Sequence, residues 1–373
     1  MPQQQYSIAY PRKRFVRTLL RSLVRIIFPM LFKITITGKE NFPESGPLIV
    51  VGNHPAAVEV VLMAAYTPWN VEPLGAGDVP QEKITQVLEG LYGQIPIRRG
   101  HVNRVSLQKA VDVLTQKGIV GIFPEGGVWN SGEARAHSGV SWLSYKTNTP
   151  ILPIGYGGTT GALTKALQFK RPKITMNIGK LIPPANVLHG KTRKAYFSEH
   201  SKKIMRTIYS LVPSNDPSLN SNVRNERFEL EIKAFNKQYE RQIIPQQFNI
   251  SHPEVLANFF HQPMILYIFS RNLEIPTLSL EKLDTRPSTH EIAHALRSIL
   301  AVLNGDYPYL LSYRVGPKTA ELIKIGLNEL EALALWAEDT GMILEIDPIR
   351  YYFAIDQDKE IIQIKQEFVE SWM

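Results

Sequence analysis

The chain has 373 residues, of which 44% are hydrophobic, and it contains no cysteine. This length is enough for two domains, and the composition is that of a globular protein. Without cysteine, disulfides, thiolate catalysis and zinc–sulfur sites are excluded. Residues 1–190 hold 21 Lys and Arg against 10 Asp and Glu, whereas residues 191–373 hold 21 against 24. A basic half indicates an anionic partner, either a membrane or a nucleic acid.

The first segment of the chain has the pattern of an amphipathic helix. Arg14, Arg17, Arg21 and Arg25 are spaced three, four and four residues apart, so they share one helical face. The uncharged run 26–32 has only seven residues, far short of the roughly 20 that span a bilayer. Arginines interrupt the apolar region, which is unlike a cleaved signal peptide. Apolar residues occupy the other faces: Phe15, Leu19, Leu23, Ile26, Ile27 and Met30.

This segment, residues 1–33, therefore favours a basic amphipathic helix lying in the interface of an anionic membrane. The alternative is an amphipathic helix packed on its own domain. The hypothesis of a nucleic-acid partner is supported only by the net charge. The basic stretch lacks the interleaved aromatic residues of such sites, so no nucleic-acid partner is expected.

The following residues, 34–190, alternate between strand and helix patterns. Strands are expected at 34–38, 47–52, 93–98, 118–123, 150–156 and 173–178, the last as an edge strand. Helices are expected at 55–66, 80–89, 102–117 and 139–147. The alternation predicts an α/β domain with a largely parallel sheet flanked by helices.

Beyond this domain the pattern changes. Residues 191–221 are interpreted as a linker containing one helix, 194–211, and residues 222–373 as a mainly helical extension of unknown function. Its helices are expected at 222–242, 253–272, 288–304 and 317–340. The alternation over 349–364 predicts a hairpin around Asp356-Gln357-Asp358.

Two polar motifs follow strands of the expected sheet, where open α/β sheets place their chemistry. His54 follows the strand 47–52 and precedes a proline, which places it near the N-terminus of a helix that contains Glu59. A carboxylate on one ring nitrogen orients a histidine and raises the basicity of the other nitrogen. The pair suits deprotonation of a substrate hydroxyl, which then attacks an activated acyl group. The alternative is a histidine that only caps a helix.

These residues resemble the glycerolipid acyltransferase family, typified by 1-acylglycerol-3-phosphate acyltransferases. The family has four sequence blocks, and the resemblance covers roughly residues 35–185. The matching residues are, in order, Asn53, His54 and Glu59; Gly93 to Arg99; Phe123-Pro124-Glu125-Gly126-Gly127; and Pro150 to Ile154.

The resemblance implies a role for each block. His54 would be the general base and Glu59 its orienting partner. Arg99, with Arg98 beside it, would bind the phosphate of the acceptor, because a guanidinium binds phosphate oxygens bidentately. Glu125 would hydrogen-bond the glycerol hydroxyls of the acceptor.

In the third block, Gly126 and Gly127 would let the backbone approach the ligand closely. The implied reaction transfers a fatty acyl group from acyl-CoA or acyl-ACP (acyl carrier protein) to a lysophospholipid or related glycerolipid, in phospholipid biosynthesis or remodelling. The thioester is a co-substrate, and neither a further cofactor nor a metal is implied. The implied location is the cytoplasmic face of a membrane, as a peripheral or monotopic protein.

Two departures from the family pattern keep alternatives open. Glu59 stands where the family has aspartate, and the third block continues as Val128-Trp129-Asn130, where an arginine is usual. Fewer cations near the acceptor leave a non-phosphorylated acceptor open. A non-catalytic lipid-binding scaffold of the same fold is a second alternative.

A minor alternative lies in the second half, where His290-Glu291-Ile292-Ala293-His294 has the H-E-x-x-H form of a zinc metalloprotease. A third ligand would have to come from a glutamate further along, among Glu321, Glu329, Glu331 and Glu338. Ser288 or Thr289 also explains Glu291 as part of a helix N-capping arrangement.

Overall fold

The computed structural model describes residues 7–77, 79–81, 83–97, 104–126, 137–186, 192–216, 225–236, 244–275, 286–355 and 362–368. The chain forms two compact units. The N-terminal unit comprises residues 1–77 and 87–222, and the C-terminal unit comprises residues 78–86 and 223–373. Each unit has its own hydrophobic core.

The N-terminal unit is built on a seven-stranded sheet in the order β1-β7-β6-β2-β5-β3-β4. Five neighbouring strands of this sheet are parallel to one another: β6, β2, β5, β3 and β4. Strand β7 is antiparallel to β6 and parallel to β1. The α/β fold with a largely parallel sheet is therefore confirmed. The strands are β1 (Lys33–Thr37), β2 (Leu48–Gly52), β3 (Val71–Ala76), β4 (Ile95–Ile97), β5 (Ile119–Ile122), β6 (Ile151–Gly157) and β7 (Lys173–Ile178).

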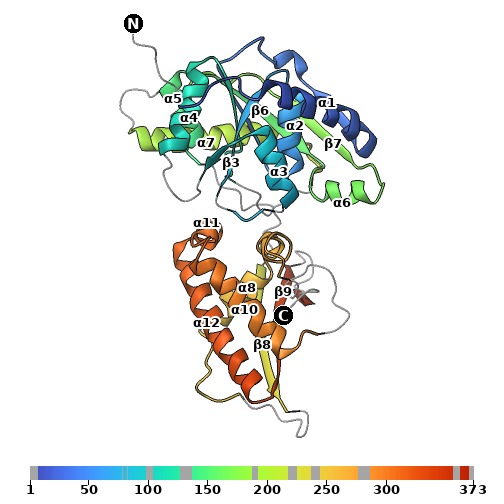
Figure 1. Ribbon diagram of the computed structural model, residues 1–373, viewed down its shortest axis with the longest axis vertical. Coiled ribbons are helices and arrows are strands. Elements are labelled where there is room, and N and C mark those ends of the chain that lie inside the picture. Colours follow the sequence, from blue (N-terminus) through green and yellow to red (C-terminus); the bar gives the residue numbers. More distant parts are fainter. Residues whose placement is uncertain are drawn as a thin grey trace. The chain divides into compact units, whose positions relative to one another are not determined.

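Helices cover both faces of this sheet (Figure 1). One apolar cluster joins the sheet to α1, α2 and α6, and the other joins it to α4, α5 and α7. The helices are α1 (Arg14–Leu31), α2 (Val58–Tyr66), α3 (Lys83–Tyr92), α4 (Arg104–Thr115), α5 (Gly139–Thr147), α6 (Ala162–Leu167) and α7 (Arg193–Ser210), with a 3₁₀ turn at Lys39–Asn41. Within the described residues, no helix is both long and apolar enough to cross a bilayer.

Two expectations for this unit were wrong in detail. The strand 173–178 is not at the edge, because β1 pairs with its outer side. Strand β3 was not expected, since it contains Glu72 and Pro73, which disfavour a strand. The proline is tolerated because Pro73 pairs with β5 alone, whereas β4 pairs only from Leu74 onward.

The arginine side of α1 packs on the protein. Arg17 is fully buried, and its guanidinium forms a bidentate ion pair with the buried carboxylate of Glu72 at 2.5 and 2.8 Å. Arg21 and Arg25 both donate to the carbonyl oxygen of Thr67, at the C-terminus of α2. Cations are favourable at the negative end of a helix dipole. The expected arginine face thus forms, but it binds α1 to its own domain.

The opposite side of α1 is apolar and faces solvent. Phe15 is 82% exposed, and Ile26 and Met30 are 66% and 68% exposed. Leu19, Leu23 and Ile27 are exposed as well. This orientation is the reverse of a soluble amphipathic helix, which buries its apolar side.

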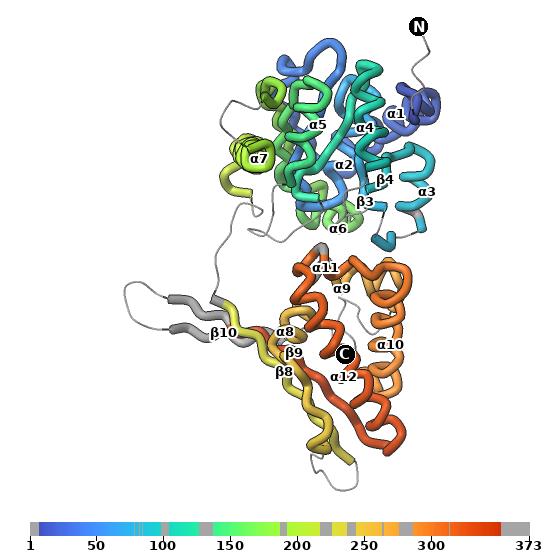
Figure 2. Tube along the Cα trace, turned by 90° about the vertical axis from the view of Figure 1, so that its left-hand side faces the viewer, coloured from blue at the N-terminus to red at the C-terminus, as the bar shows by residue number. Residues whose placement is uncertain are grey.

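The C-terminal unit combines helices with a three-stranded antiparallel sheet in the order β10-β9-β8. Figure 2 shows β8 and β9 side by side. The expected helix over 222–242 was wrong, because residues 225–235 form a strand that pairs with β9 along its whole length. The expected hairpin near the C-terminus forms from β9 and β10, and its turn lies outside the described residues. The strands are β8 (Asn225–Phe235), β9 (Ile343–Ile355) and β10 (Ile362–Phe368).

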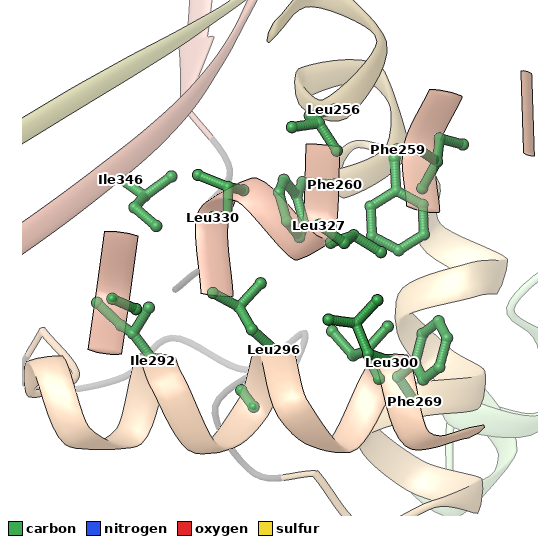
Figure 3. Packing of buried hydrophobic residues seen from close by; sticks show 14 of the residues in the cluster. Leu256, Phe259, Phe260, Phe269, Ile292, Leu296, Leu300, Leu327, Leu330 and Ile346 are labelled. Carbon is green, nitrogen blue, oxygen red and sulfur yellow. The ribbon is translucent and has the colours of Figure 1, made fainter. Parts of the chain in front are cut away.

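Helices α8, α10 and α12 bury a large apolar core against one face of this sheet (Figure 3). The expected helix over 253–272 divides into α8, α9 and a π-helical turn at Ile268–Asn272, because Pro263 begins a new helix. The helices are α8 (Pro253–Phe260), α9 (Pro263–Tyr267), α10 (Thr289–Asn304), α11 (Leu310–Val315) and α12 (Pro317–Asp339).

Candidate active site

Asn53 fixes the point where β2 ends and the first motif begins. Its amide nitrogen donates to the carbonyl oxygen of Tyr156 at 2.9 Å, and its amide oxygen accepts the Tyr156 N–H at 2.8 Å. These two bonds join the carboxyl end of β2 to β6. The buried side chain therefore sets the position from which the next residue, His54, projects.

His54 and Glu59 lie together, as their spacing predicted. The His54 Nδ1 is 3.5 Å from the Glu59 Oε2, and the Glu59 side chain is fully buried. The same Oε2 accepts the Ala56 N–H at 3.2 Å. The imidazole stacks on Phe123 from the third block, with ring centroids 4.4 Å apart. With Nδ1 turned toward Glu59, the other ring nitrogen, Nε2, is left for a substrate.

Helix α2 begins later than the expected residue 55, so His54 lies before the helix and does not cap it. Helix α2 begins at Val58, and its N-cap is Ala57. Residues 55–57 form bends before the helix, and Glu59 lies in the first turn of the helix. The Glu59 side chain turns back to the Ala56 N–H and thereby holds this bend.

Glu125 connects the two motifs. Its Oε2 accepts the His54 backbone N–H at 3.2 Å, and its Oε1 accepts the hydroxyl of Tyr209 at 2.7 Å. The side chain is only 2% exposed. Burial raises the pKa of the Glu125 carboxyl, and the hydrogen bonds from Tyr209 and His54 oppose this rise. This arrangement supports a positioning role for Glu125, beside the role in acceptor binding that the resemblance implies.

Tyr209 is the residue of the site that the sequence did not indicate. It lies on α7, in the segment interpreted as a linker, and beyond all four blocks. Burial and the adjacent Glu125 carboxylate raise the pKa of its phenol, so the hydroxyl remains a donor at neutral pH. No local pattern marks this tyrosine, because its partner is 84 residues away.

Of the four remaining site residues, the structure describes Gly126. Gly126 has φ of 73°, a left-handed conformation that favours glycine, and its N–H donates to the Phe123 carbonyl at 2.9 Å. This turn brings Glu125 to the end of β5. Arg98, Arg99 and Gly127 lie outside the described residues, and their implied roles stay predictions.

The H-E-x-x-H segment forms the start of α10. Glu291 is engaged in a capping box with Ser288. The Nδ1 of His290 is 2.6 Å from the Glu338 Oε1, and His294 is exposed. Within the described residues, no three metal-ligating side chains are grouped closely enough to hold an ion. The capping arrangement accounts for Glu291.

Comparisons with known proteins agree with the motif blocks. The family model described as Acyltransferase matches residues 33–157. The 1-acyl-sn-glycerol-3-phosphate acyltransferase of Borreliella burgdorferi is 27% identical over 140 residues, which cover 37% of this chain and 56% of that protein. The enzyme of the same name from Bacillus subtilis is 24% identical over 180 residues, covering 47% of this chain and 88% of that protein.

Two further similarities involve a human enzyme and a solved structure. The human 1-acyl-sn-glycerol-3-phosphate acyltransferase alpha is 27% identical over 136 residues, which are 35% of this chain and 48% of that protein. The crystal structure of PlsC, a 1-acyl-sn-glycerophosphate acyltransferase from Thermotoga maritima, has a TM-score of 0.39 and 17% identity, covering 53% of this chain and 79% of that one. The chain thus spans about half the length of the Borreliella protein.

The region matched by the family model contains His54, Glu59 and Glu125, and both bacterial relatives are named as acyltransferases. The chain therefore carries a domain of the glycerolipid acyltransferase family.

Proposed function

We propose that the protein transfers a fatty acyl group from an acyl thioester to the hydroxyl of a lysophospholipid or related glycerolipid. The observation that carries the proposal is the pair formed by His54 and the buried Glu59 at the carboxyl end of β2. The names of the curated relatives favour an acceptor of the 1-acylglycerol-3-phosphate type. The donor would be acyl-CoA or acyl-ACP.

The proposed reaction uses His54 as a general base. Its Nε2 takes the proton of the acceptor hydroxyl while the hydroxyl oxygen bonds to the thioester carbonyl carbon. The carbon–sulfur bond then breaks, and the thiolate takes the proton back from the imidazolium. Glu59 favours the imidazolium through its charge and fixes the tautomer that leaves Nε2 unprotonated.

We further propose that α1 brings the enzyme to its substrate by lying in a membrane interface. The support is the exposed apolar side of the helix, which includes Phe15, Ile26 and Met30. An apolar helix side buried at the level of the headgroups is typical of peripheral membrane proteins. The proposed location is the cytoplasmic face, where both thioester donors occur.

The test is turnover of purified protein with acyl-CoA and with acyl-ACP, each given a panel of lysolipids, with products identified by mass spectrometry. General-base catalysis contributes about 10²–10⁴-fold, so His54→Ala should lose at least about 100-fold in kcat while its circular dichroism spectrum stays unchanged. If His54→Ala keeps more than about a tenth of the activity, the assignment of the base is wrong.

His294→Ala is the matched control. His294 is exposed on α10 in the C-terminal unit, and its loss should leave kcat unchanged. Stoichiometric zinc in the wild type that is lost in His294→Ala would favour the metalloprotease-like alternative. Lipid binding without any product from any donor would favour the scaffold alternative.

A second variant addresses the acceptor. Arg99→Ala should raise the KM for a phosphorylated acceptor and leave the KM for the thioester unchanged, because the guanidinium is assigned to the acceptor phosphate. An unchanged acceptor KM would favour a non-phosphorylated acceptor.

A further inference from the structure

The connection between β6 and β7 exposes apolar side chains that a soluble protein would cover. Leu163 and Leu167 are 52% and 72% exposed, and Phe169 is 90% exposed. The alanines of the same helix, Ala162 and Ala166, are buried against the sheet. Helix α6 therefore holds to the domain with its small residues and presents its large residues to solvent.

Phe169 is also in an unusual backbone conformation. Its φ is 57°, in the left-handed region that non-glycine residues seldom adopt. The Phe169 N–H bonds to the Ala166 carbonyl, and the Lys170 N–H bonds to the Lys165 carbonyl. This is the pattern of a Schellman motif, in which the position of Phe169 is usually glycine. Folding alone does not explain an exposed aromatic ring at a position that suits glycine.

The surroundings of these apolar residues are basic. Lys165, Lys170, Arg171 and Lys173 are all exposed. Residues 134–198 contain ten Lys and Arg and no Asp or Glu. An apolar tip within a uniformly basic segment is complementary to a bilayer that carries anionic headgroups.

This segment is continuous with the exposed side of α1. The Arg171 guanidinium donates to the Pro29 carbonyl oxygen at 2.8 Å, in the last turn of α1. The neighbouring Met30 is 68% exposed. Figure 1 shows α6 and α1 on the same side of the N-terminal unit.

We propose that α6 and Phe169 form a second membrane contact, which inserts Leu163, Leu167 and Phe169 into the interface of an anionic bilayer. The proposal rests on the membrane association proposed for α1 and extends it. A single helix lying in the interface leaves the protein free to rotate about the helix axis. A second contact removes this freedom and fixes the orientation of the domain on the bilayer.

The experiment is vesicle flotation of the full chain, with phosphatidylcholine vesicles that contain or lack phosphatidylglycerol. Phe169→Gly should weaken binding roughly tenfold, as expected for the loss of one inserted aromatic side chain. Because the left-handed position suits glycine, the variant should melt no lower than the wild type. A loss of binding therefore cannot come from unfolding. Ile325→Ser, which alters an exposed apolar residue on α12, is the control and should bind as the wild type does.

Two further variants separate the claims. Lys165→Gln/Lys170→Gln should weaken binding only to the vesicles that contain phosphatidylglycerol. Phe15→Ser/Ile26→Ser tests α1. If the α1 variant loses binding and Phe169→Gly does not, the second contact is wrong and the membrane association proposed for α1 stands. If neither loses binding, both are wrong.

The same variant tests a second occupant, another copy of this chain. Analytical ultracentrifugation without lipid should give the same mass for the wild type and for Phe169→Gly. If the variant dissociates an oligomer while its vesicle binding is unchanged, this apolar surface is a contact between copies, and the proposal is overturned.

Discussion

Glu59 acts on His54 through both its charge and its length. Its Oε2 is held by the Ala56 N–H and lies 3.5 Å from the His54 Nδ1. Glu59→Gln keeps the length and removes the charge that stabilises the imidazolium. We expect kcat to fall about 10- to 100-fold, within the range of a general-base contribution, measured as thiol release from acyl-CoA.

Glu59→Asp tests the length of the side chain. Aspartate is the usual residue of the family, but here the carboxylate would withdraw by one methylene from both Ala56 and His54. We expect a kcat below that of the wild type, with the acceptor KM little changed. A fully active aspartate variant would show that the bend at 55–57 adapts to either residue.

Tyr209 should act on the site through Glu125. Burial raises the pKa of Glu125, and the Tyr209 hydroxyl opposes this rise, so Tyr209→Phe removes a stabilising bond to the carboxylate and raises the pKa further. A carboxylate with a higher pKa loses its charge at a higher pH. The acid limb of the kcat profile should therefore move to higher pH in Tyr209→Phe.

A purely structural role for Tyr209 predicts something else, namely a lower melting temperature with an unshifted pH profile. The matched control is Tyr196→Phe, because Tyr196 lies on the same helix and its hydroxyl accepts the Asn186 N–H. Tyr196→Phe should leave the pH profile of kcat where it is in the wild type.

The sequence predicted the pairing of His54 with Glu59 but not how the pair is held. The pairing follows from a spacing of five residues near a helix start, which is a local property. The supports of the pair come from distant segments: Asn53 binds Tyr156 in β6, and Tyr209 lies on α7. Contacts of this kind depend on the tertiary fold and leave no local pattern.

At the scale of elements, α1 shows that a sequence pattern can predict a helical face without predicting which side of the helix packs against the domain. The arginine spacing predicted one helical face, and the face exists. Which side turns inward was decided by Glu72, a buried carboxylate of β3 that requires cationic partners. The apolar side is left exposed as a consequence.

The buried ion pair gives a prediction for stability. Arg17→Ala leaves Glu72 with Arg12 as its remaining cationic partner, and Arg12 is partly exposed. Breaking a buried pair costs about 3–5 kcal/mol when one charge is left without compensation, and the remaining bond to Arg12 places the expected loss near the lower end. Urea denaturation measures the free energy of unfolding.

Arg14→Ala is the control for Arg17→Ala. Arg14 lies on the same helix and is exposed, so its loss should change the free energy of unfolding by less than about 0.5 kcal/mol. Equal effects of the two variants would show that helix propensity, and not the ion pair with Glu72, determines the loss.

Strand β8 shows an error of a different kind. Phe228, Leu230, Ile232 and Ala234 alternate with charged residues, which is the period of a strand. The segment 222–242, which was expected to be a helix, is also rich in Glu, Lys and Arg, and these residues have high helix propensity. Pairing with β9 along the whole strand outweighs that propensity. Here the periodicity was the better guide.

At the scale of the whole molecule, the two units are not two successive stretches of chain. Residues 78–86 belong to the C-terminal unit although they lie between β3 and most of α3. Val79 packs against the core of that unit, and the Pro80 carbonyl accepts the Asn272 amide at 2.6 Å. The sequence did not indicate that residues 78–86 join the C-terminal unit, because the residues that they contact there lie about 190 positions further along the chain.

Because residues 79–86 belong to the C-terminal unit, a variant that destabilises the core of this unit should also destabilise these residues. Leu296→Ala creates a cavity at a fully buried position of that core and should cost about 2–5 kcal/mol. Hydrogen exchange should then speed up in peptides that cover 79–86 and α10. Peptides of β2 should keep their protection, since β2 belongs to the core of the other unit.

Leu62→Ala, at a fully buried position on α2, should give the reverse result. If Leu296→Ala exposes β2 as readily as 79–86, the two units unfold as one, and the C-terminal unit then contributes to the stability of the site at His54.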